Sequence, residues 1–193
     1  MTYTQIISIF EKMFYDKWGY VLGTAGVKWT EKKAQETGKG KKWVGHMVAD
    51  CSGAFVYALK KGNINIYHGS NRIAREHVEK ILPIDKWEPG MIAFKSKSPG
   101  QEGYNLPADY KLGGTHYNGD LKDYYHCGLL DHDGSVINLQ SSSTGCVLST
   151  RFENWLWCAR LKGVEYSNVE RPVSISYELG RKLYEELSGY YEK

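Results

Sequence analysis

The apolar residues in the first half of the chain recur with the period of helices. Between residues 3 and 17 they fall on one helical stripe: Ile6, Ile7, Phe10, Met13 and Phe14. Asp50 is a favourable N-cap for a second helix, which we expect to end at Gly62. A third helix is predicted over residues 70–82, and the same period near the end of the chain predicts another over residues 174–191.

Short apolar runs bounded by turn residues follow in the second half, and they predict strands. The expected strands lie within "WEPGMIAFKSK", "YYHCGLL", "SVINLQ", "GCVLS" and "WLWCARLK", and "DHDG" predicts a hairpin between the second and the third. Residues 27–46 and 98–124 show neither pattern and are interpreted as loops, the second being long and ordered. This order of elements predicts an α+β fold, with helices on one side of a small antiparallel sheet of about five strands.

The composition supports one domain, either alone or with short additions. The chain has 193 residues, 41% of them hydrophobic, which is enough for one sizeable core. The net charge of +3 is mild, and we interpret the densest basic stretch, Lys32–Lys42, as a solvated loop rather than a nucleic-acid site. No apolar run approaches the roughly 20 residues that span a bilayer, so we expect no membrane insertion. The first residues lack the features of a secretory signal, so we expect synthesis in the cytoplasm.

The chain contains four cysteines: Cys51, Cys127, Cys146 and Cys158. They form no CxxC pair and no HxxxH occurs, so we expect free thiols and no structural zinc or other metal. Cys51 directly follows the predicted N-cap, where the N–H groups of a helix favour a thiolate and can hold an oxyanion. The alternative is that Cys51 is a core residue, since free cysteines are often buried. The other three cysteines are interpreted as structural.

A nucleophilic thiol needs a base, and His126 is the candidate because it opens an apolar strand. A three-residue hairpin loop with a bulge at Gly134 predicts that residue 126 lies opposite residue 138. Alternation along the strands then places His126 and Asn138 on one face, as in a Cys–His–Asn arrangement. A two-residue loop would instead put Leu139 opposite the histidine. A lone histidine on a strand can also be purely structural.

Five short motifs resemble, in order, those of NlpC-type cell-wall cysteine peptidases: "YVLGTAG", "DCSG", "WEPGMIAF", "HCGLL" and "WCARL". Together with the polar residue Asn138 they cover residues 18–161. The chain departs from this family at three points. Met91 stands where the family usually has Asp, Gly23-Thr24 replaces a glycine pair, and Asn138 stands where the family often has His.

This resemblance implies a papain-like fold and a reaction. The implied activity is that of a cysteine peptidase or amidase that hydrolyses amide bonds in peptidoglycan stem peptides, with no metal and no cofactor. Cys51 would be the nucleophile, His126 the base and Asn138 the residue that orients the base. The implied partner is peptidoglycan or its stem peptides, with no role for nucleic acid.

The resemblance also implies roles for three residues around the nucleophile. Tyr20 matches an aromatic residue near the active site that aids the oxyanion hole. Asp50 and Ser52 match positions that line the substrate pocket, and in some members of the family these positions receive the free amine of the substrate.

The papain-like domain is expected to span residues 1–165, with residues 95–125 as a long inserted loop that covers the cleft and residues 166–193 as a helical extension. Three functions stay open at this point. The first is a peptidoglycan endopeptidase or amidase, including a phage lysin, which would act at the cell wall after release or as part of a phage particle. The second is a non-catalytic phage structural or wall-binding module, and the third is a papain-like amidase with a substrate outside the wall.

Overall fold

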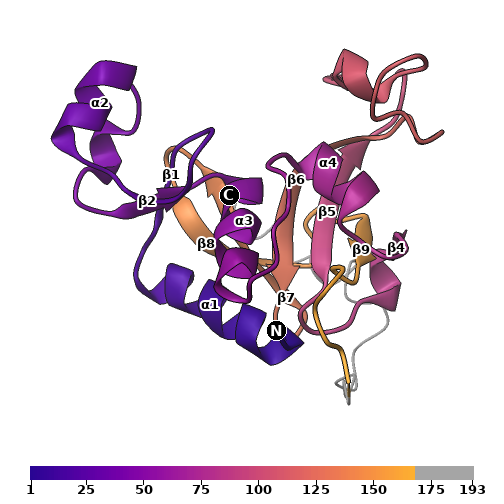
Figure 1. Cartoon of the computed structure of the whole chain (residues 1–193), viewed down its shortest axis with the longest axis horizontal. Coiled ribbons are helices and arrows are strands. Elements are labelled where there is room, and N and C mark those ends of the chain that lie inside the picture. Colours follow the sequence, from indigo (N-terminus) through magenta and orange to yellow (C-terminus); the bar gives the residue numbers. More distant parts are fainter. Residues whose placement is uncertain (168–193) are drawn as a thin grey trace, which may run out of the picture.

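A computed structural model of the chain describes residues 1–167 and shows an α+β fold (Figure 1). The expected helix over residues 174–191 lies outside the described residues. A six-stranded sheet runs in the order β4-β9-β5-β6-β7-β8, and all its neighbouring strands are antiparallel. Its strands are β4 (Leu82–Pro83), β5 (Ile92–Lys97), β6 (Asp123–Leu130), β7 (Ser135–Ser141), β8 (Gly145–Thr150) and β9 (Trp157–Ala159).

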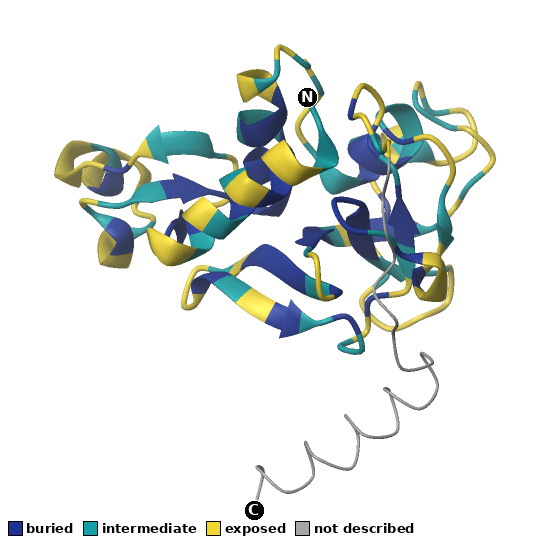
Figure 2. Cartoon of the chain, turned by 90° about the horizontal axis from the view of Figure 1, so that it is seen from below, coloured by how far each residue is buried: buried dark blue, intermediate teal, exposed yellow. Residues whose placement is uncertain are grey.

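Three helices pack on one side of this sheet: α1 (Tyr3–Tyr15), α3 (Cys51–Lys61) and α4 (Ser70–Glu76). Buried residues of all three helices share one core with the sheet; α1 and α3 also carry exposed residues, whereas every residue of α4 is buried or intermediate (Figure 2 colours the chain by burial). The predicted stripe of the first helix is buried in this core, where the rings of Phe10 and Phe55 lie 4.7 Å apart and join α1 to α3. None of the described helices is long and apolar enough to cross a membrane.

The predicted starts of α1 and α3 agree with the structure, and a side-chain cap fixes each of them. Thr2 caps α1 through a capping box with Gln5, and Asp50 caps α3 by accepting from the N–H of Gly53. Gly62 ends α3 as expected. The cap matters for the site, because it fixes Cys51 as the first residue of the helix.

The prediction of a loop over residues 27–46 was wrong. This region forms a small lobe with a three-stranded sheet in the order β1-β3-β2, seen beside the main sheet in Figure 1. The lobe contains β1 (Gly19–Tyr20), β2 (Ala25–Lys28), α2 (Glu31–Thr37), the 3-10 turn η1 (Lys41–Trp43) and β3 (Met47–Ala49). The side chains of Trp29 and Trp43 are buried at its centre. Two isolated tryptophans produce no periodic pattern, so only their packing identifies the lobe.

Two further predictions need correction at the other edge of the molecule. The sheet has six strands rather than about five, because Leu82 and Pro83 pair with Cys158 and Trp157 at the edge. The helix predicted over residues 70–82 ends at Glu76. Beyond it the chain is extended, with a bridge between residues 78 and 161, and the 3-10 turn η2 (Ile84–Lys86) follows the edge strand. Pairing across the sheet thus overrides the local helical period.

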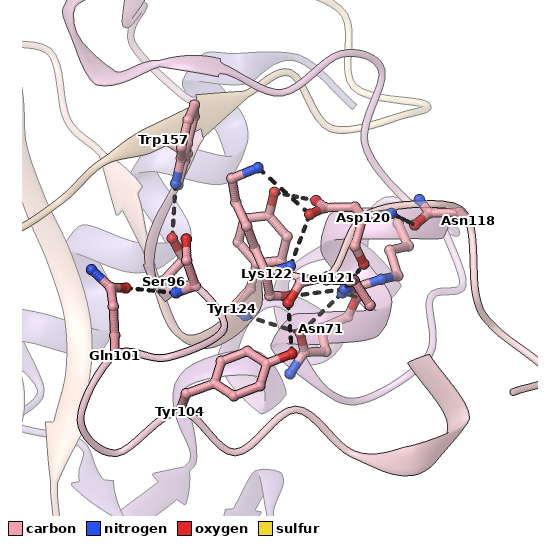
Figure 3. A network of polar contacts seen from close by, with 12 residues as sticks. Asn71, Ser96, Gln101, Tyr104, Asn118, Asp120, Leu121, Lys122, Tyr124 and Trp157 are labelled. Carbon is pink, nitrogen blue, oxygen red and sulfur yellow. Dashed lines mark hydrogen bonds and ion pairs between the residues drawn. The ribbon is translucent and has the colours of Figure 1, made fainter. Parts of the chain in front are cut away.

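The segment between β5 and β6 is fastened to α4 rather than free. Its one helical turn within residues 98–122 is η3 (Ala108–Tyr110). The guanidinium of Arg75 donates to the backbone carbonyls of Asp120 and Lys122 at 2.9 and 2.8 Å. Asn71 and Tyr124 join the same polar network, which Figure 3 shows from close by. The expectation of a long ordered loop therefore agrees with the structure.

Candidate active site

Cys51 lies in the wall of a cleft with a volume of about 390 Å³. The residue is only 9% exposed, but it lines this cleft. The other lining residues come from the small lobe, the start of α3, the loop before α4, and β6: Tyr20, Leu22, Gly23, Asp50, Ser52, His68, Gly69, Ser70 and Tyr125. A substrate in the cleft would therefore meet a sulfur atom at a helix N-terminus.

Two neighbours on β6 favour the thiolate form of Cys51. The thiol of Cys127 hydrogen-bonds its sulfur, and His126 adds a second hydrogen bond and an opposite charge. These effects outweigh burial and the negative charge of Asp50, and they lower the pKa of Cys51 to about 5. Burial and the charge of Cys51 raise the pKa of Cys127 well above its ordinary value, so Cys127 keeps its proton and acts as the donor.

The imidazole of His126 is held by the amide of Asn138. Nε2 of the ring lies 2.9 Å from Oδ1 of Asn138. The amide nitrogen of Asn138 donates to the carbonyl of Val136 and to the hydroxyl of Ser149, so its oxygen must face the ring. Nε2 therefore carries a proton in either form of the ring, and Nδ1 is the nitrogen left for Cys51. Nδ1 takes the proton of the Cys51 thiol, and the positive ring that results then donates to the thiolate.

The hairpin register differs from the predicted one by two residues, so the faces are as expected. The observed pairs are Leu129 with Ile137 and Leu130 with Val136, which places residue 128 rather than residue 126 opposite residue 138. The histidine reaches Asn138 diagonally, and both side chains still share one face. Gly128 makes this possible, because a Cβ there would lie 2.8 Å from the Cβ of Asn138.

Trp155 and Ser149 complete the support of the histidine, and neither was predicted from the sequence. The indole ring of Trp155 lies 5.5 Å from the imidazole of His126 and is fully buried. Its Nε1 donates to the hydroxyl of Ser149, which in turn accepts from Asn138. These residues follow β7 in the sequence, and no local pattern connects them with the histidine.

Asp50 caps α3 and also hydrogen-bonds the small lobe. Its carboxylate accepts from the N–H of Gly23 at 2.7 Å, the hydroxyl of Ser52 at 3.0 Å and the N–H of Gly53 at 2.7 Å. The side chain is 5% exposed. The hydrogen bond and charge of His68, together with the N–H groups of Gly53 and Gly23, outweigh burial and lower the pKa of Asp50. The carboxylate therefore stays ionised and joins the small lobe to the start of α3.

Tyr20, which the resemblance places near the active site, does line the cleft. Burial, with smaller contributions from the charges of Cys51 and Asp50, raises the pKa of its phenol. The phenol therefore keeps its proton at neutral pH and can donate a hydrogen bond into the cleft.

His68 is a cleft residue for which no role was predicted from the sequence. Its Nε2 lies 2.7 Å from Oδ1 of Asp50. The hydrogen bond to this carboxylate raises the pKa of His68. His68 lies 17 residues after Cys51 in a loop without periodic pattern, so only the fold reveals this contact.

Residues 95–125 were expected to form a loop that covers the cleft, but in the structure they do not cover it. Of this range, only Tyr125, within β6, lines the cleft. The intervening loop is held on α4 by Arg75 instead. In the described part of the chain, no group of three or more His, Cys, Asp or Glu side chains is placed to hold a metal ion.

Comparison with solved structures identifies the class of fold: the chain has the papain-like fold of NlpC/P60 proteins. It is similar to the P60 domain of an antigen from M. avium subspecies paratuberculosis, with a TM-score of 0.51 and 17% identity over 85% of this chain and 98% of that one. It is also similar to the peptidoglycan hydrolase RipB from Mycobacterium tuberculosis, with a TM-score of 0.50 and 15% identity over 85% of this chain and 67% of that one. No protein-family model and no curated sequence matches the chain.

Proposed function

We propose that this protein is a cysteine hydrolase that cleaves amide bonds in the stem peptides of peptidoglycan. One observation carries the proposal: the sulfur of Cys51 lies at the start of α3, in a cleft, beside a histidine whose tautomer is fixed by Asn138. This arrangement supports thiolate chemistry, because nucleophile, base and orienting group occupy adjacent positions. The fold shared with the peptidoglycan hydrolase RipB supports the choice of substrate class.

The proposed reaction follows from these positions. The thiolate of Cys51 attacks the carbonyl carbon of the amide and forms a tetrahedral intermediate. A backbone N–H at the start of α3 and the phenol of Tyr20 are the candidate donors to its oxyanion, each contributing about 3 kcal/mol of transition-state stabilisation. His126 delivers a proton to the leaving amine. It then takes a proton from the water that releases the acyl group from Cys51.

The remaining contacts prepare the site before substrate arrives. The hydrogen bond from Cys127 and the helix N-terminus keep the sulfur ionised. Asn138, supported by Ser149 and Trp155, holds the histidine in one orientation. Because these groups are buried and packed, little reorganisation is needed when the transition state forms.

Digestion of purified peptidoglycan tests the proposal. We expect the unaltered protein to release stem-peptide fragments, whose masses identify the cleaved bond, and Cys51→Ala to release none. Cys146→Ala is the matched control, because Cys146 is another buried cysteine but does not line the cleft. Equal release by the protein and Cys51→Ala would overturn the assignment of the nucleophile. Absence of release by the folded, unaltered protein would overturn the assignment of the substrate.

A further inference from the structure

The carboxylate of Asp50 has little capacity left for a ligand. Four donors already contact it: Gly23 through one oxygen, and Ser52, Gly53 and His68 through the other. The side chain is 5% exposed, so a group in the cleft reaches it only by displacing one of these donors. A buried carboxylate that loses a donor without a replacement is destabilised.

The hydroxyl of Ser52 is engaged in the same way. It donates to Asp50 at 3.0 Å and accepts from the backbone N–H of Gly69 at 3.2 Å. The resemblance to NlpC-type peptidases implied that Asp50 and Ser52 receive a free amine of the substrate. In this chain, both groups are turned toward protein partners.

His68 is the group that faces a ligand instead. Its side chain is 35% exposed, it lines the cleft, and its Nε2 is used by Asp50. Within residues 1–167, Nδ1 of this ring has no hydrogen-bond partner. When the ring is protonated, Nδ1–H is a donor, and the pair with Asp50 carries no net charge.

We propose that His68 determines which substrates bind in the part of the cleft beside Asp50. It favours a substrate that presents an oxygen acceptor there and disfavours a substrate that presents a free primary amine. This inference rests on the proposed amide hydrolysis and narrows its substrate class. The favoured substrate carries an acylated residue here, whose carbonyl oxygen accepts from Nδ1–H. An ammonium group would meet the positive imidazolium and find no vacant carboxylate.

Two synthetic stem peptides, identical except that one has a free N-terminal amine and the other is N-acetylated, provide the test. We expect the protein to cleave the acetylated peptide with a kcat/KM about tenfold higher. His68→Gln keeps a neutral N–H donor toward Asp50 but removes the positive charge, so this preference should disappear or reverse. His132→Gln is the matched control, because His132 is an exposed histidine in the β6–β7 turn and should leave the ratio unchanged. A preference of the unaltered protein for the free amine, or an unchanged ratio in His68→Gln, overturns the inference.

The experiment distinguishes failure of the proposed hydrolysis from failure of the role proposed for His68. If the unaltered protein cleaves neither peptide, the hydrolysis proposal fails for this substrate class, and calorimetric binding of both peptides to Cys51→Ala then decides the specificity. Tighter binding of the acetylated peptide supports the role of His68. Equal binding, reversed binding or no binding of either peptide overturns it.

Discussion

Removal of the Cys127 thiol should make the Cys51 sulfur harder to ionise, although Cys127 itself never meets a substrate. Cys127 is fully buried on β6, next to His126, and its hydrogen bond to Cys51 contributes most to lowering the pKa of that residue to about 5. In Cys127→Ala the donor is lost, while burial and the charge of Asp50 remain to oppose ionisation. We therefore expect the pKa of Cys51 to rise.

The size of the rise follows from the strength of the lost contact. A hydrogen bond to a charged group stabilises by about 1.5–3 kcal/mol, which corresponds to a pKa shift of about one to two units. At pH 6 the thiolate fraction should then fall from roughly nine-tenths to between about one-half and one-tenth. Cys127→Ser keeps a donor at the same place and should leave the pKa of Cys51 close to 5.

The assay is the rate of alkylation by iodoacetamide as a function of pH, followed by intact-protein mass spectrometry. Cys127 and Cys158 are fully buried, and burial raises the pKa of Cys146 to about 12, so labelling of the folded protein reports Cys51. Cys51→Ala measures the background. A midpoint near 9 in the unaltered protein, or the same midpoint in Cys127→Ala, would refute the reasoning.

The same pKa makes stability depend on pH in a definite direction. The folded-state pKa of Cys51, about 5, lies below the ordinary value of 9.0, so ionisation favours the folded state. This contribution is complete above the pKa of the unfolded thiol and is lost as the pH falls through 5. Relative to Cys51→Ala, the melting temperature of the unaltered protein should therefore fall more steeply on acidification across this range.

Two further predictions concern the support of the site. Asn138→Ala should release the histidine and lower kcat, measured at saturating substrate, by roughly 10²-fold. The same substitution made in Cys51→Ala should leave the Kd for the peptide unchanged. An unchanged kcat would contradict the orienting role of Asn138. Arg75→Ala leaves two carbonyls without their donor, at a cost of about 1–3 kcal/mol each, and should speed tryptic cleavage within residues 98–122. Lys32→Ala is the control, because the side chain of Lys32 is exposed. Equal cleavage rates of the two variants would contradict the anchoring of this loop by Arg75.

The parts of the site that depend on neighbouring residues could be predicted from the sequence. The cap at Asp50 and the apolar run behind it specify a helix that starts at Cys51, because both signals act within one turn. The period of two along a strand likewise places His126 and Asn138 on one face, even though the predicted register was off by two residues. A shift of two residues leaves the faces unchanged, so this conclusion holds in spite of the error.

The tertiary structure alone decided what surrounds these residues. The contacts of Cys127 with Cys51, of His68 with Asp50 and of Trp155 with His126 join segments that are distant in sequence. Their formation depends on how α3, the loop before α4 and the end of the sheet pack together. The small lobe and the edge strand β4 were missed for the same reason, since tryptophan packing and edge pairing are long-range contacts that leave no period in the sequence. Local signals in this chain thus specify where Cys51 and His126 lie along the fold, and long-range packing specifies the charges and hydrogen bonds around them.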